Sequence, residues 1–219
     1  MAVISRRNGY LFLLAPRTAS TAVGDVMCKQ LGGRFIPKRD MLDEHGALIV
    51  ERKHSTARQL VDAGLLRRRG VDNLFVITAV RNPFDSLVTW WVKKKTSYVP
   101  LLADPNSFVH RSKSAVTDIR FVMDHTFDEW VSRNYADATP RSMYAEWLED
   151  ADFVMRYERL QDDFEAAMGR VGIDQVPLIP VLNPTEAKDA DYRSYYTPHS
   201  RRRVARAFAP DLERFGYRF

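Results

Sequence analysis

Cysteine is scarce in this sequence, because Cys28 is the only one among 219 residues. One thiol cannot close a disulfide within the chain, so a secreted scaffold held together by disulfides is excluded. The cysteine content suits a reducing compartment, and we expect a cytoplasmic location.

Long apolar runs are also missing. The longest run near the N-terminus, Tyr10–Ala15, is far shorter than the ~20 residues that cross a bilayer. Two arginines precede it, as in a secretion signal, but Pro16 follows at once. We therefore expect a buried strand here and no membrane partner.

Several familiar motifs are absent. The five histidines and Cys28 show no metal-ligand spacing, so we expect no metal. The G-x-x-x-x-G-K-[ST] loop of many nucleotide-binding proteins does not occur, nor does the G-x-S-x-G turn of many hydrolases. No nucleic-acid-binding motif is visible, and we expect no nucleic-acid partner.

The chain does contain enough apolar material for a core and a surplus of positive charge. Hydrophobic residues make up 45% of the sequence, which is inconsistent with global disorder. The length fits a single domain over residues 1–219. Lysine and arginine number 33 against 28 acidic residues, and the formal net charge of +5 favours anionic ligands.

The first part of the chain alternates short apolar runs with helical patterns. Strands are predicted at three segments, 10–15, 47–50 and 74–80, and a helical pattern follows each of them. The second helical pattern extends to the basic residues before Gly70, and the third begins with Asn82 as N-cap. This alternation, with fully apolar strands, predicts an α/β fold in three layers, α/β/α, around a central parallel sheet.

The segment from about 96 to 141 differs, because it mixes prolines and charged residues with scattered aromatics. We expect loops and short helices there, with one helix near its end. The elements expected from that helix onward lie at Phe127–Tyr135, Tyr144–Leu148, Phe153–Tyr157 (a strand), Leu160–Val171 and after Thr197–Pro198, with a break at Pro210.

The first candidate site is the segment Ala15–Ala22, between a predicted strand and the start of a helix. Small and hydroxyl residues there let backbone N–H groups face a ligand, and the helix dipole adds partial positive charge. Arg17 adds a full charge. These features are typical of a phosphate-binding loop, although an ordinary capped helix after a strand shows similar residues.

The second candidate is Arg81 with the helix that follows it. Arg81 ends the central predicted strand, and ligands bind at such strand ends in open α/β sheets. Ser86 and Thr89 share the polar flank of the helix. An arginine fork with a hydroxyl group suits a second phosphate, while an ion pair of Arg81 with Asp85 is the competing interpretation.

Together these segments resemble the cofactor motifs of sulfotransferases that use 3′-phosphoadenosine-5′-phosphosulfate (PAPS). In that family a Pro-Lys-Thr/Ser-Gly/Ala-Thr/Ser-Thr/Ser loop binds the 5′-phosphosulfate, and Pro16–Thr21 matches it. The family's Arg-Asn-Pro-x-Asp-x-x-x-Ser motif binds the 3′-phosphate, and Arg81 and Thr89 match it at the same spacing. The resemblance implies a P-loop-NTPase-like sulfotransferase fold, PAPS as the donor and 3′-phosphoadenosine-5′-phosphate (PAP) as its product.

The resemblance continues to the C-terminus, although residues 96–141 match nothing. The further matching segments are Arg156–Leu160 with Asp163-Phe164, and Tyr195–Pro198 with Asp211 and Phe215–Tyr217. The residues implied to bind the cofactor are Arg17, Thr18, Ala19, Ser20, Thr21, Arg81, Thr89 and Arg193. Arg17 stands where the family has lysine, and Thr89 where it has serine. Arginine does not lose its proton, and this difference bears on the rate of transfer more than on binding.

The resemblance also suggests a general base. In the small-molecule branch of the family a Lys/His pair in this interval supplies the base, and Lys53-His54 fits by type and order. A near-neutral pKa suits the removal of a proton from an acceptor hydroxyl. Glu44 is the rival, because glycan-modifying relatives often use a glutamate at about that distance after the loop.

The implied reaction is in-line transfer of a sulfuryl group from PAPS to a hydroxyl of a small molecule or glycan, assisted by positioning and positive charge. Arg17, Lys53 and His54 are its expected catalytic residues. We expect the loop-rich segment 96–141 to bind the acceptor. A nucleotide-dependent kinase on a similar fold and a non-catalytic anion-binding module are the alternatives.

Overall fold

The computed structural model describes residues 2–45, 48–136 and 139–219. The chain divides into two compact units. The first combines Met1–Arg81 with Tyr144–Leu182, and the second combines Asn82–Met143 with Asn183–Phe219. The predicted single domain over residues 1–219 stays a prediction.

The first unit is built on a five-stranded sheet with the order β3-β1-β2-β6-β7. Its strands are β1 (Ala2–Ser5), β2 (Tyr10–Leu13), β3 (Arg34–Ile36), β6 (Phe75–Val80) and β7 (Phe153–Arg156). Strands β2, β6 and β7 pair in parallel, and β1 runs antiparallel to both β2 and β3. All strands except β1 therefore point the same way, which confirms the predicted sheet as mostly parallel.

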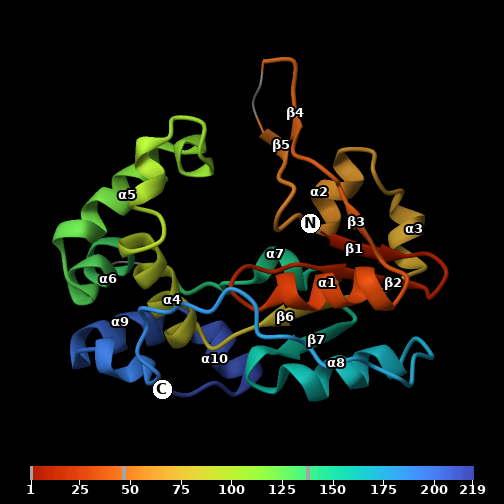
Figure 1. Ribbon diagram of the computed structural model, residues 1–219. Coiled ribbons are helices and arrows are strands. Elements are labelled where there is room, and N and C mark those ends of the chain that lie inside the picture. Colours follow the sequence, from red (N-terminus) through yellow and green to blue (C-terminus); the bar gives the residue numbers. More distant parts are fainter. Residues whose placement is uncertain (1, 46–47, 137–138) are drawn as a thin grey trace. The chain divides into compact units, whose positions relative to one another are not determined.

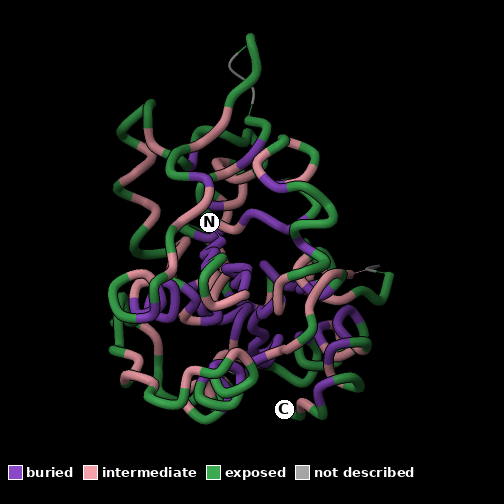
Figure 2. The backbone as a smooth tube through the Cα atoms, turned by 90° about the vertical axis from the view of Figure 1, so that its right-hand side faces the viewer, coloured by how far each residue is buried: buried purple, intermediate pink, exposed green. Residues whose placement is uncertain are grey.

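Helices cover both faces of this sheet (Figure 1). Tyr10 and Phe12 of β2 pack in a core with α1 (Ser20–Gln30) and α8 (Leu160–Gly169). Leu11 and Leu13 point to the opposite face, because side chains alternate along a strand. That face packs against α2 (Ala57–Asp62), α3 (Arg68–Asp72) and Trp147 of α7 (Ala145–Leu148). Strands β1, β2 and β6 of this sheet are almost wholly buried, whereas β3 and β7 are mostly half-buried or exposed (Figure 2).

One predicted strand is not part of this sheet. Of the segment 47–50, Ala47 lies outside the described residues, and Leu48–Val50 forms β5. This strand pairs antiparallel with β4 (Met41–Leu42) in a separate hairpin, where Leu48 and Ile49 are exposed. The assignment to the central sheet was wrong because a short apolar run followed by a helix resembles a β–α unit.

The helix predicted after this strand is also interrupted. It ends at Asp62, and α3 begins at Arg68, so Gly70 lies inside a helix and does not end one. Gly64 adopts a φ of 70° between the two helices, which glycine tolerates without steric cost.

The second unit is helical. It contains α4 (Pro83–Lys95), α5 (Lys113–Asp124), α6 (Phe127–Tyr135), α9 (Pro198–Ala207) and α10 (Ala209–Phe215), with short 3-10 turns at Pro100–Ala103, Phe108–Arg111 and Tyr192–Tyr195. The Asn82 side chain caps α4 by accepting from Phe84 N, as predicted, and α9 ends before Pro210. Within the described ranges, no helix is long and apolar enough to cross a membrane.

Candidate functional site

A strained loop connects β2 to α1. Arg17 and Ala19 adopt φ values of 66° and 56°, in the left-handed region. That region costs a non-glycine residue roughly 1–2 kcal/mol. Backbone strain of this kind concentrates at ligand-binding sites, where the surrounding structure enforces it.

Hydrogen bonds inside the loop hold this conformation. Thr18 Oγ1 and Ser20 Oγ both donate to the carbonyl oxygen of Ala15, at 2.9 and 2.7 Å, and all three residues are buried. Across the described part of the chain, no side chain caps the N-terminus of α1. The first N–H groups of α1 and the positive end of its dipole are therefore available to an anion.

Arg81 lies directly against this loop. Its Nη1 donates to the carbonyl oxygen of Arg17 at 3.2 Å, although 64 residues separate them in sequence. The Arg81 side chain is largely buried, since the residue is only 8% exposed. Its guanidinium carbon lies 3.9 Å from the centre of the Tyr157 ring, in cation–π contact. Arg81, the first residue of the second sequence motif, thus meets the loop of the first motif within the first unit.

His54 contacts the same loop. Its Nδ1 lies 2.8 Å from the carbonyl oxygen of Leu14, and its backbone φ is 64°. A carbonyl only accepts, so Nδ1 carries the proton and the lone pair of the neutral ring resides on Nε2. Burial lowers the pKa of His54 to about 4, and the positive charges of Arg17 and Lys53 act in the same direction. His54 is therefore neutral at pH 7.

The other candidates for the base region are more exposed. Lys53 precedes His54 and is exposed. Glu44 lies in the turn of the β4–β5 hairpin, its side chain is 87% exposed, and its carboxylate is 3.5 Å from His45 Nε2. Of the two proposed bases, His54 is the one with a direct bond to the loop.

Two expected cofactor residues belong to the second unit. Thr89 is buried in α4, where its Oγ1 donates to the carbonyl oxygen of Asp85 at 3.0 Å. Arg193 is exposed, and its guanidinium pairs with Asp191 at 3.1 Å. The Asp85 carboxylate, the other predicted partner for Arg81, forms an ion pair with Lys188. The roles of Thr89 and Arg193 stay predictions.

Each of the other two segments that resemble the family contains a buried aspartate that accepts hydrogen bonds from the chain around it. Buried Asp163 accepts from the backbone N–H of Arg156 at 2.7 Å and from Arg159 Nη2 at 2.8 Å, which fixes the turn between β7 and α8. Asp211 is also buried, and it accepts from Ser142 Oγ and from the N–H of Met143. Tyr157 lies in one of the segments that match the family, and its contact with Arg81 has no signal in the sequence.

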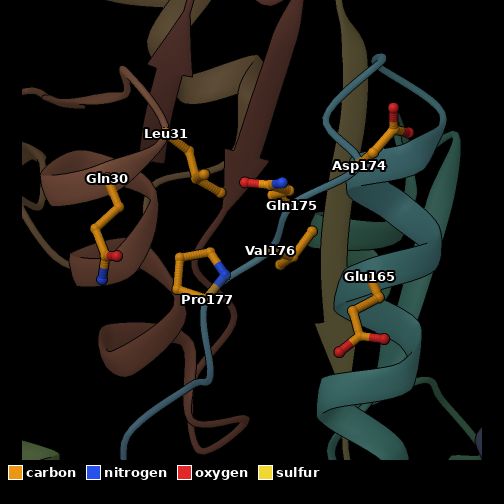
Figure 3. A pocket seen from close by; sticks show the side chains of 7 residues that line it. All are labelled: Gln30, Leu31, Glu165, Asp174, Gln175, Val176 and Pro177. Atoms are coloured by element: carbon orange, nitrogen blue, oxygen red, sulfur yellow. The ribbon is translucent and has the colours of Figure 1, made fainter.

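A cavity of about 710 Å³ lies at the opposite end of α1 from the loop (Figure 3). Its lining consists of two carboxylates, two amides and three apolar side chains, from Gln30, Leu31, Glu165, Asp174, Gln175, Val176 and Pro177. With no cation in its lining, this cavity is unsuited to an anionic donor.

A second cavity, of about 450 Å³, is lined by Asp25, Phe35, Lys38 and Arg52. Asp25 lies on α1 beyond the loop, and Arg52 is two residues before His54. Among the described residues, no three His, Cys, Asp or Glu side chains are grouped so that they could hold a metal ion.

Comparison with known proteins identifies the family. The model of the sulfotransferase family matches residues 1–218, so the chain belongs to this family, and its mostly parallel sheet flanked by helices is consistent with the sulfotransferase fold. No curated protein and no solved structure matches the chain.

Proposed function

We propose that this protein transfers a sulfuryl group from PAPS to a hydroxyl group of a small molecule or glycan. Membership of the sulfotransferase family supports a transferase. The observation that carries the proposal is the bond of Arg81 to the Arg17 carbonyl, because it brings a largely buried cation to a strained loop before an uncapped helix.

The residues around the loop fit a nucleotide with several anionic groups. Arg17 and the N–H groups of Ala19–Thr21 are suited to the 5′-phosphosulfate, since the helix N-terminus and the guanidinium both favour negative charge. Arg81 supplies a planar fork for the 3′-phosphate. When bound, PAPS supplies an activated sulfuryl group. The proposed cofactor-binding residues also include Thr18, whose hydroxyl stabilises the loop by its bond to the Ala15 carbonyl. Thr89 and Arg193 are included because of the resemblance in sequence alone.

His54 is the proposed general base. Its Nε2 is the unprotonated nitrogen at neutral pH and can accept the proton of an acceptor hydroxyl, while the Leu14 carbonyl fixes the tautomer. Lys53 is the proposed charge partner, and Glu44 is the alternative base. Arg17 contributes by holding negative charge as it develops near the loop.

The two alternative functions are separable from this one. A kinase would turn over ATP with magnesium, whereas the family match favours sulfuryl transfer. A non-catalytic module would bind PAP without transfer from labelled PAPS. We also propose a cytoplasmic location, for which the low cysteine content is the support.

The test combines binding and transfer. We expect calorimetry to show PAP binding to the unchanged protein, and radiolabelled PAPS to give a labelled product with at least one hydroxyl acceptor. Arg81→Ala should lower PAP affinity strongly, because a charge-assisted pair is lost. The control is Arg170→Ala, an exposed arginine after α8, which should bind PAP normally. Equal PAP affinity in both variants would contradict the proposal.

A further inference from the structure

The second cavity of the first unit has a lining that suits an organic anion. Its volume of about 450 Å³ lies within the ~300–1,000 Å³ range of small-molecule sites. Two cations and an aromatic ring, from Lys38, Arg52 and Phe35, line it together with the carboxylate of Asp25. Lys29 Nζ lies 3.3 Å from that carboxylate and offsets its charge. The cavity therefore has a local surplus of positive charge, which favours a negatively charged ligand.

The β4–β5 hairpin brings the two cations to this cavity from opposite arms. Lys38 precedes β4, and Arg52 follows β5. The strands pair antiparallel, so their outer ends lie side by side at the base of the hairpin. There the backbone N–H of Arg52 donates to the carboxylate of Asp40, which joins the two arms. Two positive charges that line one cavity repel each other, and an anion bound between them relieves this repulsion.

Both cations are available to a ligand. Among the residues that the structure describes, no acidic side chain forms an ion pair with the side chain of Lys38 or Arg52. Both residues are exposed, so they can turn toward a ligand without breaking an existing contact. An arginine fork matches the two oxygens of a carboxylate, and a lysine adds a mobile point charge.

The cavity lies in the neighbourhood of the proposed base. Arg52 is two residues before His54 in the chain. On the other side of the cavity, Phe35 and Leu14 pack together against α1 at Gly24. A Cβ at Gly24 would lie 3.2 Å from Phe35 Cε1 and 3.4 Å from Leu14 Cδ2. The carbonyl oxygen of this same Leu14 lies 2.8 Å from His54 Nδ1. The lining of the cavity and the proposed base are thus linked both along the chain and through Leu14.

We infer that this cavity binds the acceptor, and that the acceptor is a hydroxyl compound that also carries a carboxylate. Lys38 and Arg52 bind the carboxylate, and the ring of Phe35 contacts the apolar part of the molecule. The hydroxyl group is the part left to react near His54. The inference deepens the proposed function and rests on it for the reaction.

The experiment compares two pairs of acceptors that differ in this one charge. The phenolic pair is para-hydroxyphenylacetate and its neutral amide, and the sugar pair is methyl glucuronoside and methyl glucoside. Calorimetry measures their binding to the PAP-loaded protein, and radiolabelled PAPS measures kcat/KM for transfer. In at least one pair we expect the carboxylate to bind more tightly and to react faster than its neutral partner. The preference should weaken as salt rises, because both cations are exposed.

Three variants, each lacking one positive charge, assign the preference to the cavity. Lys38→Met and Arg52→Met should each lower kcat/KM for the carboxylate by about 2- to 10-fold, the size of a partly exposed charged contact. The neutral partner should be affected much less. The matched control is Arg6→Met, an exposed arginine before β2, at the opposite end of that strand from the loop. It should keep the preference of the unchanged protein.

Four results would overturn the inference. They are equal use of both members in both pairs, no binding of any of the four compounds to the PAP-loaded protein, a preference that survives in both Lys38→Met and Arg52→Met, and an equal loss of preference in Arg6→Met. The last result would assign the effect to the net charge of the molecule.

The outcome also separates the inference from the proposed function. If labelled sulfate reaches neutral and charged acceptors equally, the proposed function stands and the inference fails. If the carboxylates bind through Lys38 and Arg52 but PAPS transfers no sulfate to any acceptor, the proposed function fails and the binding site for the carboxylate stands.

Discussion

His54 is a histidine whose surroundings keep it neutral. Burial first, and then the charges of Arg17 and Lys53, disfavour the imidazolium form, while the Leu14 carbonyl orients the ring. A neutral, oriented imidazole is ready to accept a proton, and its low pKa limits how strongly it holds that proton. The type and order of the residue were predictable, but the carbonyl partner and the burial were not, because neither has a sequence signal.

The first prediction concerns the pH dependence of transfer. A base must be unprotonated, so the acidic limb of kcat/KM should follow the protonation of His54 in the free protein. We expect its midpoint below the ordinary histidine value of 6.5, toward about 4, so activity should persist as pH falls through 6.5. The measurement is initial transfer rate against pH at low acceptor concentration. A midpoint at or above 6.5 would contradict the assignment.

The second prediction separates His54 from Glu44. His54→Ala should reduce transfer by roughly 10²–10⁴-fold, the contribution of a placed base. It should leave PAP affinity nearly unchanged, because its role concerns the acceptor. Glu44→Gln is the control, since that carboxylate is 87% exposed in a hairpin turn. If transfer survives in His54→Ala and is lost in Glu44→Gln, the base is Glu44.

Secondary structure elements with a strong pattern were predictable, and those defined by distant contacts were not. Strand β6 and helices α4 and α6 have apolar patterns or caps that identify them locally. Strand β1 is only four residues long and exists because it pairs with both β2 and β3. Helix α5 has apolar residues at helical spacing, such as Ile119 and Val122, but the prolines and charged residues in the segment before it indicated loops and short helices.

The third prediction concerns the passage from α1 to β3, where Gly33 is packed without room for a side chain. A Cβ there would lie 2.5 Å from Val3 Cγ1 and 2.9 Å from both the Met27 carbonyl oxygen and the Tyr10 hydroxyl. Gly33→Ala should therefore lower the free energy of unfolding by about 1–3 kcal/mol. Gly169→Ala, at the end of α8 with nothing within 4 Å, should cost nothing measurable. Urea unfolding followed by circular dichroism compares the two; equal midpoints would show that the backbone near Gly33 yields easily.

The net charge of the whole molecule follows from its composition, but the positive charges suited to binding an anion lie at one place. The formal net charge of +5 predicts anionic ligands in general. The cavity at the far end of α1 is lined by carboxylates and amides, while the loop end of α1 has Arg17 and Arg81. Sequence motifs located the loop end. They could not show that residues 64 positions apart form one hydrogen bond, because that depends on the packing of β2 beside β6.

The fourth prediction follows from this charge distribution. A ligand that binds only the folded chain increases the free energy of unfolding, by about 2.7 kcal/mol when its concentration is 100 times the dissociation constant. The thermal midpoint of unfolding rises as a result. We expect PAP to raise the midpoint more than adenosine 5′-phosphate at equal concentration. The difference should largely persist as salt rises from low to physiological levels, because salt screens the contacts of a largely buried charge such as Arg81 much less than contacts between exposed charges. Identical shifts from the two nucleotides would argue against recognition of a 3′-phosphate.

The bonds from Thr18 and Ser20 to the Ala15 carbonyl have a consequence for the kinetics of association. Both hydroxyl groups are already engaged, and the left-handed residues beside them are already in place. The proposed nucleotide would therefore meet a loop whose conformation is already set, and little conformational entropy of this loop would be lost on binding. Association with this loop should proceed in a single fast phase, and nucleotides of different affinity should differ mainly in their dissociation rates.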